Sequence, residues 1–290
     1  MQHTQHDGTP SGLPFAGVGR TLVMGVVNVT PDSFSDGGRW FDPGAAAEHG
    51  FELVRHGADL VDVGGESTRP GALPVDREEE LRRVVPVVRR LADAGVLVSV
   101  DTMWAETAEQ AIEAGAVLVN DVSGGRADPG MVPLVARAEI PFVVMHWRAH
   151  SQQMQQHTEY RDVVEDVLTE LWEQFDAVCD AGVDPERIVL DPGLGFSKTG
   201  DQNWTLLAHL DRFTSLDRPL LVAASRKGFL GALLADEVGP RPVDEREDAT
   251  AAISTLSALA GAWGVRVHDP RRSADAVRVV ARLRQERPGE

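Results

Sequence analysis

Residues 96–121 read VLVSVDTMWAETAEQAIEAGAVLVND and contain one copy of a pattern that is repeated along the chain. Two short runs of Val and Leu, at 96–101 and 117–121, flank an amphipathic stretch over 104–114. Gly115 stands where a helix over that stretch has to end, since glycine readily adopts the left-handed backbone that closes many helices. Continuous apolar runs, without alternation, are typical of parallel strands covered on both faces. We therefore expect a strand, a helix and a second, parallel strand.

The same alternation recurs along the chain. Strand-like runs lie at 21–29, 60–65, 96–101, 117–121, 141–146, 187–191, 219–225 and 264–269. Helical patterns lie between them, at about 43–57, 78–94, 104–114, 130–138, 159–181, 202–212, 228–235 with 246–262, and 273–286. Eight such units in 290 residues predict an α/β protein, a (β/α)8 TIM barrel formed by a single domain. An open doubly wound sheet is the alternative, because eight units do not prove that the sheet closes.

The N-terminus and the single cysteine set further limits. Residues 1–14 have neither a basic start nor an apolar core, so they do not resemble a signal peptide. We expect a disordered tail over 1–14 and a barrel domain over 15–290. The chain has no apolar run long enough to span a bilayer, and Cys179 has no partner for an internal disulfide. These features favour a cytoplasmic protein.

The charge of the chain excludes some partners. Its 28 basic and 45 acidic residues give a net charge of −17. Such a surface repels phosphate backbones and anionic lipids, which argues against nonspecific binding to nucleic acid or to a membrane. It does not exclude a small anionic substrate, because a local group of Arg and Lys side chains can reverse the field inside a cleft.

Every predicted strand ends in a polar or glycine-rich segment, whereas the strand starts carry nothing comparable. These segments are Asn28, GGESTRPG (64–71), DT (101–102), ND (120–121), MHW (145–147), DPGLGF (191–196), SRK (225–227) and RVHD (266–269). Each one alone is more often a helix cap, a turn or a satisfied polar group than a functional residue. In a barrel, however, all of them meet at the rim where barrel enzymes carry their active sites. We therefore expect an active site there.

The side chains at this rim indicate what it binds. Asp101, Asn120 and Asp191 can pair with the N–H, amino and carbonyl edges of a flat heterocycle. Cationic side chains and hydroxyls suited to an anionic group come from Arg69, Lys227, Arg266, His268, Thr68 and Ser225. The set favours a hydrogen-bonding heterocycle joined to phosphates.

Other barrel chemistries fit less well. A metal-dependent hydrolase needs several clustered His ligands, but only His146 and His268 lie on the rim. A Schiff-base aldolase would use Lys227, since a lysine in an apolar barrel can have a lowered pKa. That lysine follows Arg226 among anion-binding groups, which favours contact with a phosphate or a ring. The chain contains no P-loop motif.

The chain resembles the dihydropteroate synthase family. The family's motifs are matched in order by MGVVNVTPDSFSDGG, VDVGGESTRPGA, SVDT, VNDVSGG, MHWR, LDPGLGF, ASRKGFLG and VRVHD, over residues 21 to 282. MHWR and GAWGVRVHD are most similar to the actinobacterial branch. The resemblance implies a transferase of folate biosynthesis, which condenses 6-hydroxymethyl-7,8-dihydropterin pyrophosphate with 4-aminobenzoate to give 7,8-dihydropteroate and pyrophosphate.

The resemblance also implies roles for individual residues. Catalysis would fall to Lys227, Arg266, His268 and Asp101. The pterin and its pyrophosphate would be bound by Thr68, Asp101, Asn120, Asp191, Lys227, Arg266 and His268. The 4-aminobenzoate site would be formed by Arg69, Pro70, Phe34, Phe196 and Ser225, with Lys227 beside them. Asn28 would meet a Mg²⁺ ion that serves as cofactor, and the segments 28–38 and 66–72 would act as lids that exclude water.

Further implications concern partners and alternatives. Sulfonamides imitate 4-aminobenzoate in this family, so they should compete here. The family also implies a homodimer, which we expect to pack through the last helices. One departure is Gly228, where the family usually has Arg or Ser after the lysine of the SRK motif. Two other readings remain: a catalytically silent pterin-binding paralogue, and a methyltetrahydrofolate:corrinoid methyltransferase. The second has no need for the anion-binding groups of SRK and STRPG.

Overall fold

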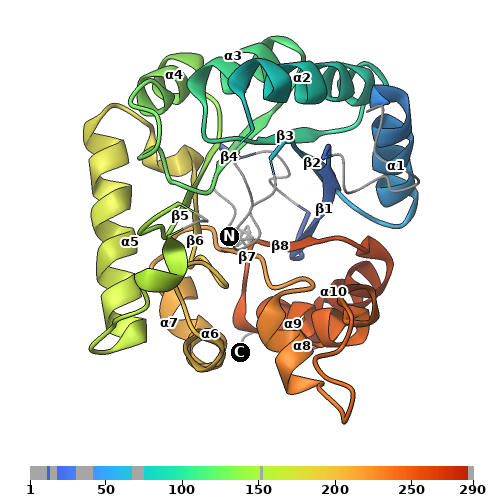
Figure 1. Cartoon of the computed structure of the whole chain (residues 1–290), viewed down its shortest axis with the longest axis vertical. Coiled ribbons are helices and arrows are strands. Elements are labelled where there is room, and N and C mark those ends of the chain that lie inside the picture. Colours follow the sequence, from blue (N-terminus) through green and yellow to red (C-terminus); the bar gives the residue numbers. More distant parts are fainter. Residues whose placement is uncertain (1–11, 14–17, 31–41, 67–74, 151–152, 287–290) are drawn as a thin grey trace, which may run out of the picture.

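The computed structural model describes residues 12–13, 18–30, 42–66, 75–150 and 153–286, which form a parallel barrel surrounded by helices (Figure 1). The strands are β1 (Leu22–Asn28), β2 (Leu60–Gly64), β3 (Val98–Asp101), β4 (Leu118–Asp121), β5 (Phe142–Met145), β6 (Ile188–Asp191), β7 (Leu221–Val222) and β8 (Gly264–Val267). All of the pairings between these strands are parallel.

Helices follow the strands and form the outer layer (Figure 1). They are α1 (Pro43–Arg55), α2 (Arg77–Asp93), α3 (Ala105–Glu113), α4 (Met131–Ala138), α5 (Val163–Asp180), α6 (Gly200–Ala208), α7 (Leu210–Thr214), α8 (Gly228–Leu233), α9 (Glu247–Ala260) and α10 (Pro270–Gln285). Short 3₁₀ turns occupy Met154–Gln156, Pro185–Arg187 and Val243–Glu245. Helices of the described residues are all too short or too polar to cross a membrane.

The sheet closes, so the prediction of a barrel is confirmed and the open-sheet alternative is wrong. The strands pair in the order β6-β5-β4-β3-β2-β1-β8-β7. The two ends of that order meet through a parallel bridge between Leu190 and Leu220. There the Leu190 N–H donates to the carbonyl oxygen of Pro219 over 2.8 Å.

Most predicted boundaries agree with the structure to within a few residues, and two of the differences have identifiable reasons. The pattern over 202–212 divides into α6 and α7, because the backbone of His209 leaves helical geometry at φ −121°. Helix α10 begins at Pro270, earlier than predicted, because the Asp269 carboxylate caps it by accepting from the Arg271 N–H. Strand β7 keeps only Leu221–Val222 of the run 219–225.

Leu13, near the end of the predicted N-terminal tail, packs against the amino-terminal end of the barrel. Of residues 1–14, the structure describes only Gly12 and Leu13. Leu13 is buried in an apolar cluster with residues from the strand starts, among them Leu22 and Leu60. This cluster fills the amino-terminal end of the barrel, as the packed interior of such barrels requires.

The barrel interior changes from apolar to polar along the strands. Side chains alternate along a strand, so residues two apart share a face. The interior face therefore runs from Leu60 to Asp62 on β2 and from Leu118 to Asn120 on β4, and all four side chains are buried. The same step leads from Val189 to Asp191 on β6. The fold thus places its buried polar residues at the carboxyl ends of the strands.

Candidate active site

An ion pair across the top of the barrel forms the centre of the site. The Arg266 guanidinium, on β8, donates from Nε to Asp62 Oδ2 over 2.7 Å and from Nη2 to Asp101 Oδ2 over 2.6 Å. Asn120 Nδ2 donates to the same Asp62 oxygen over 2.9 Å. Gly64, beside Asp101 in the strand register, leaves room for this arrangement, because a Cβ there would lie 3.2 Å from the Asp101 Cβ.

Burial governs the electrostatics of this centre. It raises the pKa of Asp101 to about 7, with Arg266 acting in the opposite direction and the nearby Asp62 carboxylate adding to the rise. Burial by itself would lower the pKa of Arg266, but Asp62 and Asp101 raise it above its ordinary value. Oδ1 of Asp62 is buried without a hydrogen-bond partner among the described residues. Arg266 and its two carboxylate partners therefore form a buried, polarised floor.

Asp191 closes the opposite side of this floor. It ends β6, is 4% exposed, and accepts a hydrogen bond of 2.7 Å from the Gly193 N–H through Oδ1. Burial raises the pKa of its carboxyl, and the Gly193 bond opposes that rise. Gly193 adopts φ +68°, and a Cβ there would stand 2.4 Å from the His146 carbonyl oxygen. Only glycine fits this turn.

Lys227 reaches the site from the loop between β7 and α8. Its Nζ donates to the Leu194 carbonyl oxygen over 2.7 Å and lies 4.3 Å from the centroid of the Phe196 ring. Burial lowers the pKa of this ammonium to about 8, although the Asp191 carboxylate works to raise it. Gly195, at φ +80°, lets the side chain pass, since a Cβ there would lie 2.8 Å from Lys227 Cδ. A cation thus lies against an aromatic face.

The loop that carries Lys227 is held from behind. Arg226 adopts φ +60°, and its guanidinium bonds the Glu247 carboxylate. Arg246 Nη1 donates to the Arg226 carbonyl oxygen over 2.8 Å, and its guanidinium lies where a Cβ of Gly231 would be. By contrast, a Cβ at Gly228 would meet nothing within 4 Å. Packing therefore does not require glycine at position 228, where the chain departs from the family pattern.

Ser225 and His268 meet beside this loop. The Ser225 hydroxyl lies 3.0 Å from His268 Nδ1, and it also accepts from the His268 backbone N–H over 3.2 Å. The two motifs SRK and RVHD, far apart in sequence, are thereby joined at the rim.

Of the remaining residues predicted to form the site, one is described by the structure and four lie outside the described residues. Asn28 ends β1 opposite Gly64 in the register and is partly exposed. Phe34, Thr68, Arg69 and Pro70 lie outside the described residues. The two segments predicted as lids fall mostly there too.

Sequence reasoning missed several buried residues near this rim. Asp62 was left without a specific role, although it sits two residues after Leu60 on the interior face. Glu80 of α2 is 1% exposed and accepts from the hydroxyls of Thr102 and Thr107. Lys198, 3% exposed, lies two residues after the DPGLGF motif. The signal in each case was a charged residue within an otherwise buried segment.

No group of three or more His, Cys, Asp and Glu side chains able to hold a metal occurs in the parts of the chain that the structure describes. His146, one of the two rim histidines, is fully buried and bonded through both ring nitrogens, to Lys198 and to Glu170. It is a structural group.

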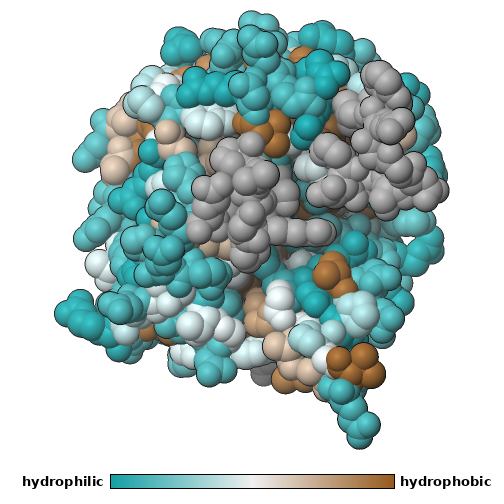
Figure 2. Space-filling view, in the orientation of Figure 1, coloured by the Kyte–Doolittle hydropathy of each residue, from teal (hydrophilic) through white to brown (hydrophobic). Residues whose placement is uncertain are grey.

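The face in Figure 2 is mainly hydrophilic, and hydrophobic residues gather on it chiefly at the lower right, over the region of α8 to α10.

Comparison with known proteins identifies the family. Residues 24–268 match the pterin binding enzyme family. The chain is 56% identical over 260 residues to the dihydropteroate synthase of Mycobacterium leprae, covering 89% of this chain and 92% of that protein. It is 42% identical to the Bacillus subtilis dihydropteroate synthase, covering 91% and 88%.

Solved structures agree with these relatives. Dihydropteroate synthase from Xanthomonas albilineans with 4-aminobenzoic acid superposes with a TM-score of 0.84 at 44% identity, covering 91% of this chain and 93% of that one. The Yersinia pestis dihydropteroate synthase in a sulfonamide drug complex gives a TM-score of 0.85 at 38% identity, covering 92% and 95%. With the closed barrel and its polar rim, these matches show that the chain belongs to the dihydropteroate synthases, pterin-binding transferases of folate biosynthesis.

Proposed function

We propose that the described rim performs the family's condensation of 6-hydroxymethyl-7,8-dihydropterin pyrophosphate with 4-aminobenzoate, with Asp101, Asn120 and Asp191 binding the pterin. The observation that carries this proposal is the convergence of three strands on one buried polar floor. Asn120 uses Nδ2 on Asp62, which leaves its carbonyl oxygen as an acceptor for a ring N–H. Asp191 uses Oδ1 on the Gly193 N–H, which directs Oδ2 to the amino edge of the ligand.

Lys227 connects the two substrates in this proposal. An ammonium has three N–H donors, and the Leu194 carbonyl oxygen takes one of them. The others suit an acceptor of the pterin ring, while the Phe196 ring below the ammonium forms an apolar wall for 4-aminobenzoate. Ser225 lies on the same side of the rim, joined to His268. Phe34, Arg69 and Pro70 complete this wall in the proposal.

Catalysis in this arrangement depends on departure of the pyrophosphate. The amino group of 4-aminobenzoate is a weak nucleophile, so the enzyme gains most by stabilising charge on the leaving group. Arg266 and His268, with Thr68, would supply positive charge and hydrogen bonds to it. Positive charge then develops on the pterin methylene, and the carboxylate of Asp101 stabilises it. A buried, dry floor limits the competing attack by water.

The residues present fit a Mg²⁺ ion bound largely by the substrate. Magnesium usually takes one or two protein oxygens and fills its shell with phosphate oxygens and water. The Asn28 side chain, at the end of β1, offers one such oxygen beside the proposed pyrophosphate position. When bound, the ion would neutralise charge on the pyrophosphate.

We also propose a homodimer packed through α9 and α10, in a cytoplasmic protein. These two helices lie side by side, and Arg284 Nη2 donates to the Leu259 carbonyl oxygen over 3.2 Å. Their outer faces expose Leu256, Leu259, Val279 and Leu283, each more than half exposed. Grouped aliphatic side chains of this kind suit burial against a second copy of the chain.

The product of the reaction tests the proposed function. Purified protein is incubated with dihydropterin pyrophosphate, 4-aminobenzoate and Mg²⁺, and 7,8-dihydropteroate is measured by chromatography. We expect product, and we expect a sulfonamide to inhibit in competition with 4-aminobenzoate. Absence of product with intact pterin binding would favour the silent paralogue. Methyl transfer from methyltetrahydrofolate to a corrinoid would favour the other alternative.

A further inference from the structure

The loop between β6 and α6 is held in place through its backbone. The carbonyl oxygens of Gly193 and Phe196 each accept from Lys198 Nζ over 3.0 Å. The Leu194 carbonyl accepts from Lys227. The Ser197 carbonyl accepts from the Tyr160 hydroxyl over 3.0 Å. This loop carries the Phe196 ring, so these bonds determine where the ring lies.

Lys198 contributes more of these bonds than any other side chain described. Its ammonium has three donors, and it has three acceptors at 3.0 Å: His146 Nδ1, the Gly193 carbonyl and the Phe196 carbonyl. The side chain is 3% exposed. With every donor used and no solvent access, Lys198 has no means of reacting with a substrate. Its role is to hold other groups.

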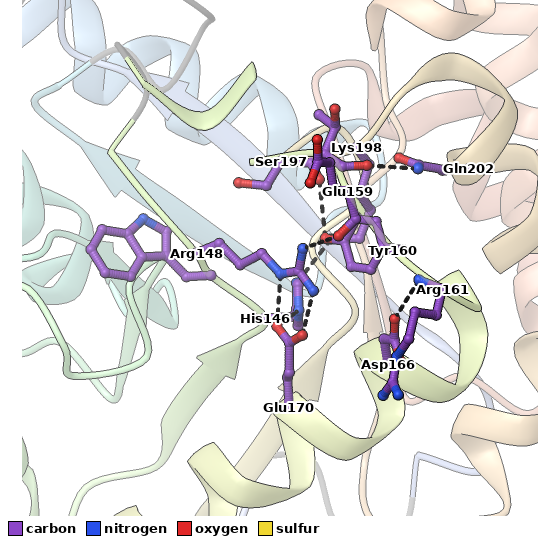
Figure 3. Close-up of polar contacts among 12 residues, drawn as sticks. His146, Arg148, Glu159, Tyr160, Arg161, Asp166, Glu170, Ser197, Lys198 and Gln202 are labelled. Carbon is purple, nitrogen blue, oxygen red and sulfur yellow. Dashed lines mark hydrogen bonds and ion pairs between the residues drawn. The ribbon is translucent and has the colours of Figure 1, made fainter. Parts of the chain in front are cut away.

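The ammonium is itself fixed by a chain of polar contacts, which Figure 3 shows between the end of β5 and helix α5. Because His146 Nδ1 accepts from Lys198, the other ring nitrogen carries the proton and donates to Glu170 Oε2 over 3.0 Å. Arg148 Nε donates to the same Glu170 oxygen over 2.8 Å. The Arg148 guanidinium lies 3.7 Å from the centroid of the Tyr160 ring. This series of contacts thus leads back to the loop through Tyr160, whose hydroxyl donates to the Ser197 carbonyl oxygen.

The two sides of the substrate site are anchored differently. On the pterin side, Asp191 belongs to a strand and holds the Gly193 N–H directly. On the 4-aminobenzoate side, Phe196 lies in the loop, 7% exposed; its carbonyl accepts from Lys198, and its own N–H donates only within the loop, to the Gly193 carbonyl oxygen over 3.1 Å. Loss of the bond from Lys198 should therefore disturb one substrate more than the other.

We propose that Lys198, together with Tyr160, is a positioning residue that sets the Phe196 ring for 4-aminobenzoate. The inference rests on the proposed assignment of Phe196 to the 4-aminobenzoate site. Lys198→Met removes the ammonium while keeping most of the side-chain volume, and it leaves the two carbonyls and His146 Nδ1 without their donor. The loop keeps its sequence and its bonds from Lys227 and Tyr160, but loses both bonds from Lys198.

A double-mutant cycle tests this proposal. Lys198→Met should raise KM for 4-aminobenzoate about tenfold and change KM for the pterin pyrophosphate less than about threefold. In a Phe196→Ala background the same change should alter KM for 4-aminobenzoate less than about twofold, because the ring through which Lys198 acts is gone. Additive effects of the two substitutions, or equal losses for both substrates, would overturn the proposal.

A matched control and a milder variant accompany the cycle. Thr21→Val removes a buried bond of 2.7 Å to the Ala262 carbonyl at the far end of the barrel, so it should lower stability without shifting either KM. If Lys198→Met fails to fold, Tyr160→Phe removes only the hydroxyl bond to Ser197. It should raise KM for 4-aminobenzoate about threefold with the same selectivity. An unselective or absent effect in that variant overturns the proposal.

Phe196→Ala alone distinguishes an error in the proposed 4-aminobenzoate site from an error in the positioning role of Lys198. If that variant leaves KM for 4-aminobenzoate unchanged, the proposed substrate site is wrong. If it raises KM while Lys198→Met does not, only the positioning role fails.

Discussion

The Arg266 guanidinium and the Asp101 carboxylate meet at 2.6 Å across the barrel, although their strands, β8 and β3, are separated by β1 and β2. Contact across the interior is possible because both side chains point into the barrel. The same inward direction brings Asp62 and Asn120 to the pair. Pterin binding in the proposed function depends on this floor.

Asp101→Asn should weaken pterin binding. The substitution replaces an acceptor-only carboxylate by an amide and removes one of the charges that pair with Arg266. We expect Kd for the pterin pyrophosphate to rise at least about tenfold, measured by calorimetry. Asp162→Asn is the control, since Asp162 caps α5 and asparagine caps equally well. Equal pterin affinity in Asp101→Asn and the native chain would contradict the assignment.

Lys227→Ala should abolish turnover and leave the fold intact. The ammonium donates to a loop carbonyl and stacks on one ring, so its removal costs little packing elsewhere. We expect kcat/KM to fall at least about a thousandfold with a circular dichroism spectrum like that of the native chain. Turnover at the native rate would remove Lys227 from the site.

The pH dependence of activity should report the same ammonium. Burial lowers the pKa of Lys227 to about 8, so the cation is lost as the pH rises through that value. We expect kcat/KM for 4-aminobenzoate to decline above about pH 8, measured in buffers of constant ionic strength. A profile that stays flat to pH 10 would show that the charge of Lys227 is not needed.

Glu80 should make stability depend on pH. Burial raises its pKa from 4.5 to about 7, while hydrogen bonds from Thr107 and Thr102 oppose the rise. The native state therefore binds more protons than the unfolded state between those values, and the contribution to stability is lost as the pH rises through about 7. Glu80→Gln should match the native chain at pH 4.5 and exceed it at pH 8 by on the order of 1–3 kcal/mol, measured by urea denaturation. A constant difference across that range would contradict this reading.

Two glycines should respond to alanine in opposite ways. Gly193→Ala places a Cβ 2.4 Å from the His146 carbonyl oxygen at a positive φ, so we expect a loss of about 3 kcal/mol or more and a damaged site. Gly228→Ala meets open space at the start of α8 and should stabilise the chain by about 0.5 kcal/mol. Thermal unfolding of both variants checks the pair, and similar losses in the two would contradict the geometry.

Leu283→Glu should disrupt the proposed dimer. It places a charge on the exposed aliphatic face of α9 and α10, where a second copy would have to bury it. Light scattering should show a dimer for the native chain and a monomer for the variant. Val238→Glu is the control, because Val238 is 97% exposed and lies outside both helices. A native chain with the mass of a monomer would refute the dimer.

The fold was predictable because its signals are local. Each strand is a short run of Val, Ile and Leu. The predicted helix stop at Gly115 adopts a positive φ, as do Gly57, Gly95 and Gly182 just after α1, α2 and α5. The strand pattern predicted the barrel but left an open sheet as the alternative, because the closing bridge from Leu190 to Leu220 joins units that look alike in sequence.

The candidate site was predictable only at the strand ends. Asp101, Asn120 and Asp191 follow apolar runs directly, so their place on the rim follows from the strand pattern. Asp62 and Lys198 received no role, because their roles depend on contacts with residues 204 and 52 positions away in the chain. No local pattern reports such partners.

The most direct measurement is the release of pyrophosphate from dihydropterin pyrophosphate with Mg²⁺, with and without 4-aminobenzoate. If the rim joins the two substrates, release should depend on 4-aminobenzoate, stop when a sulfonamide is added, and be absent in Lys227→Ala. Tight binding of the pterin pyrophosphate without release by the native chain would contradict the catalytic account and leave a pterin-binding barrel.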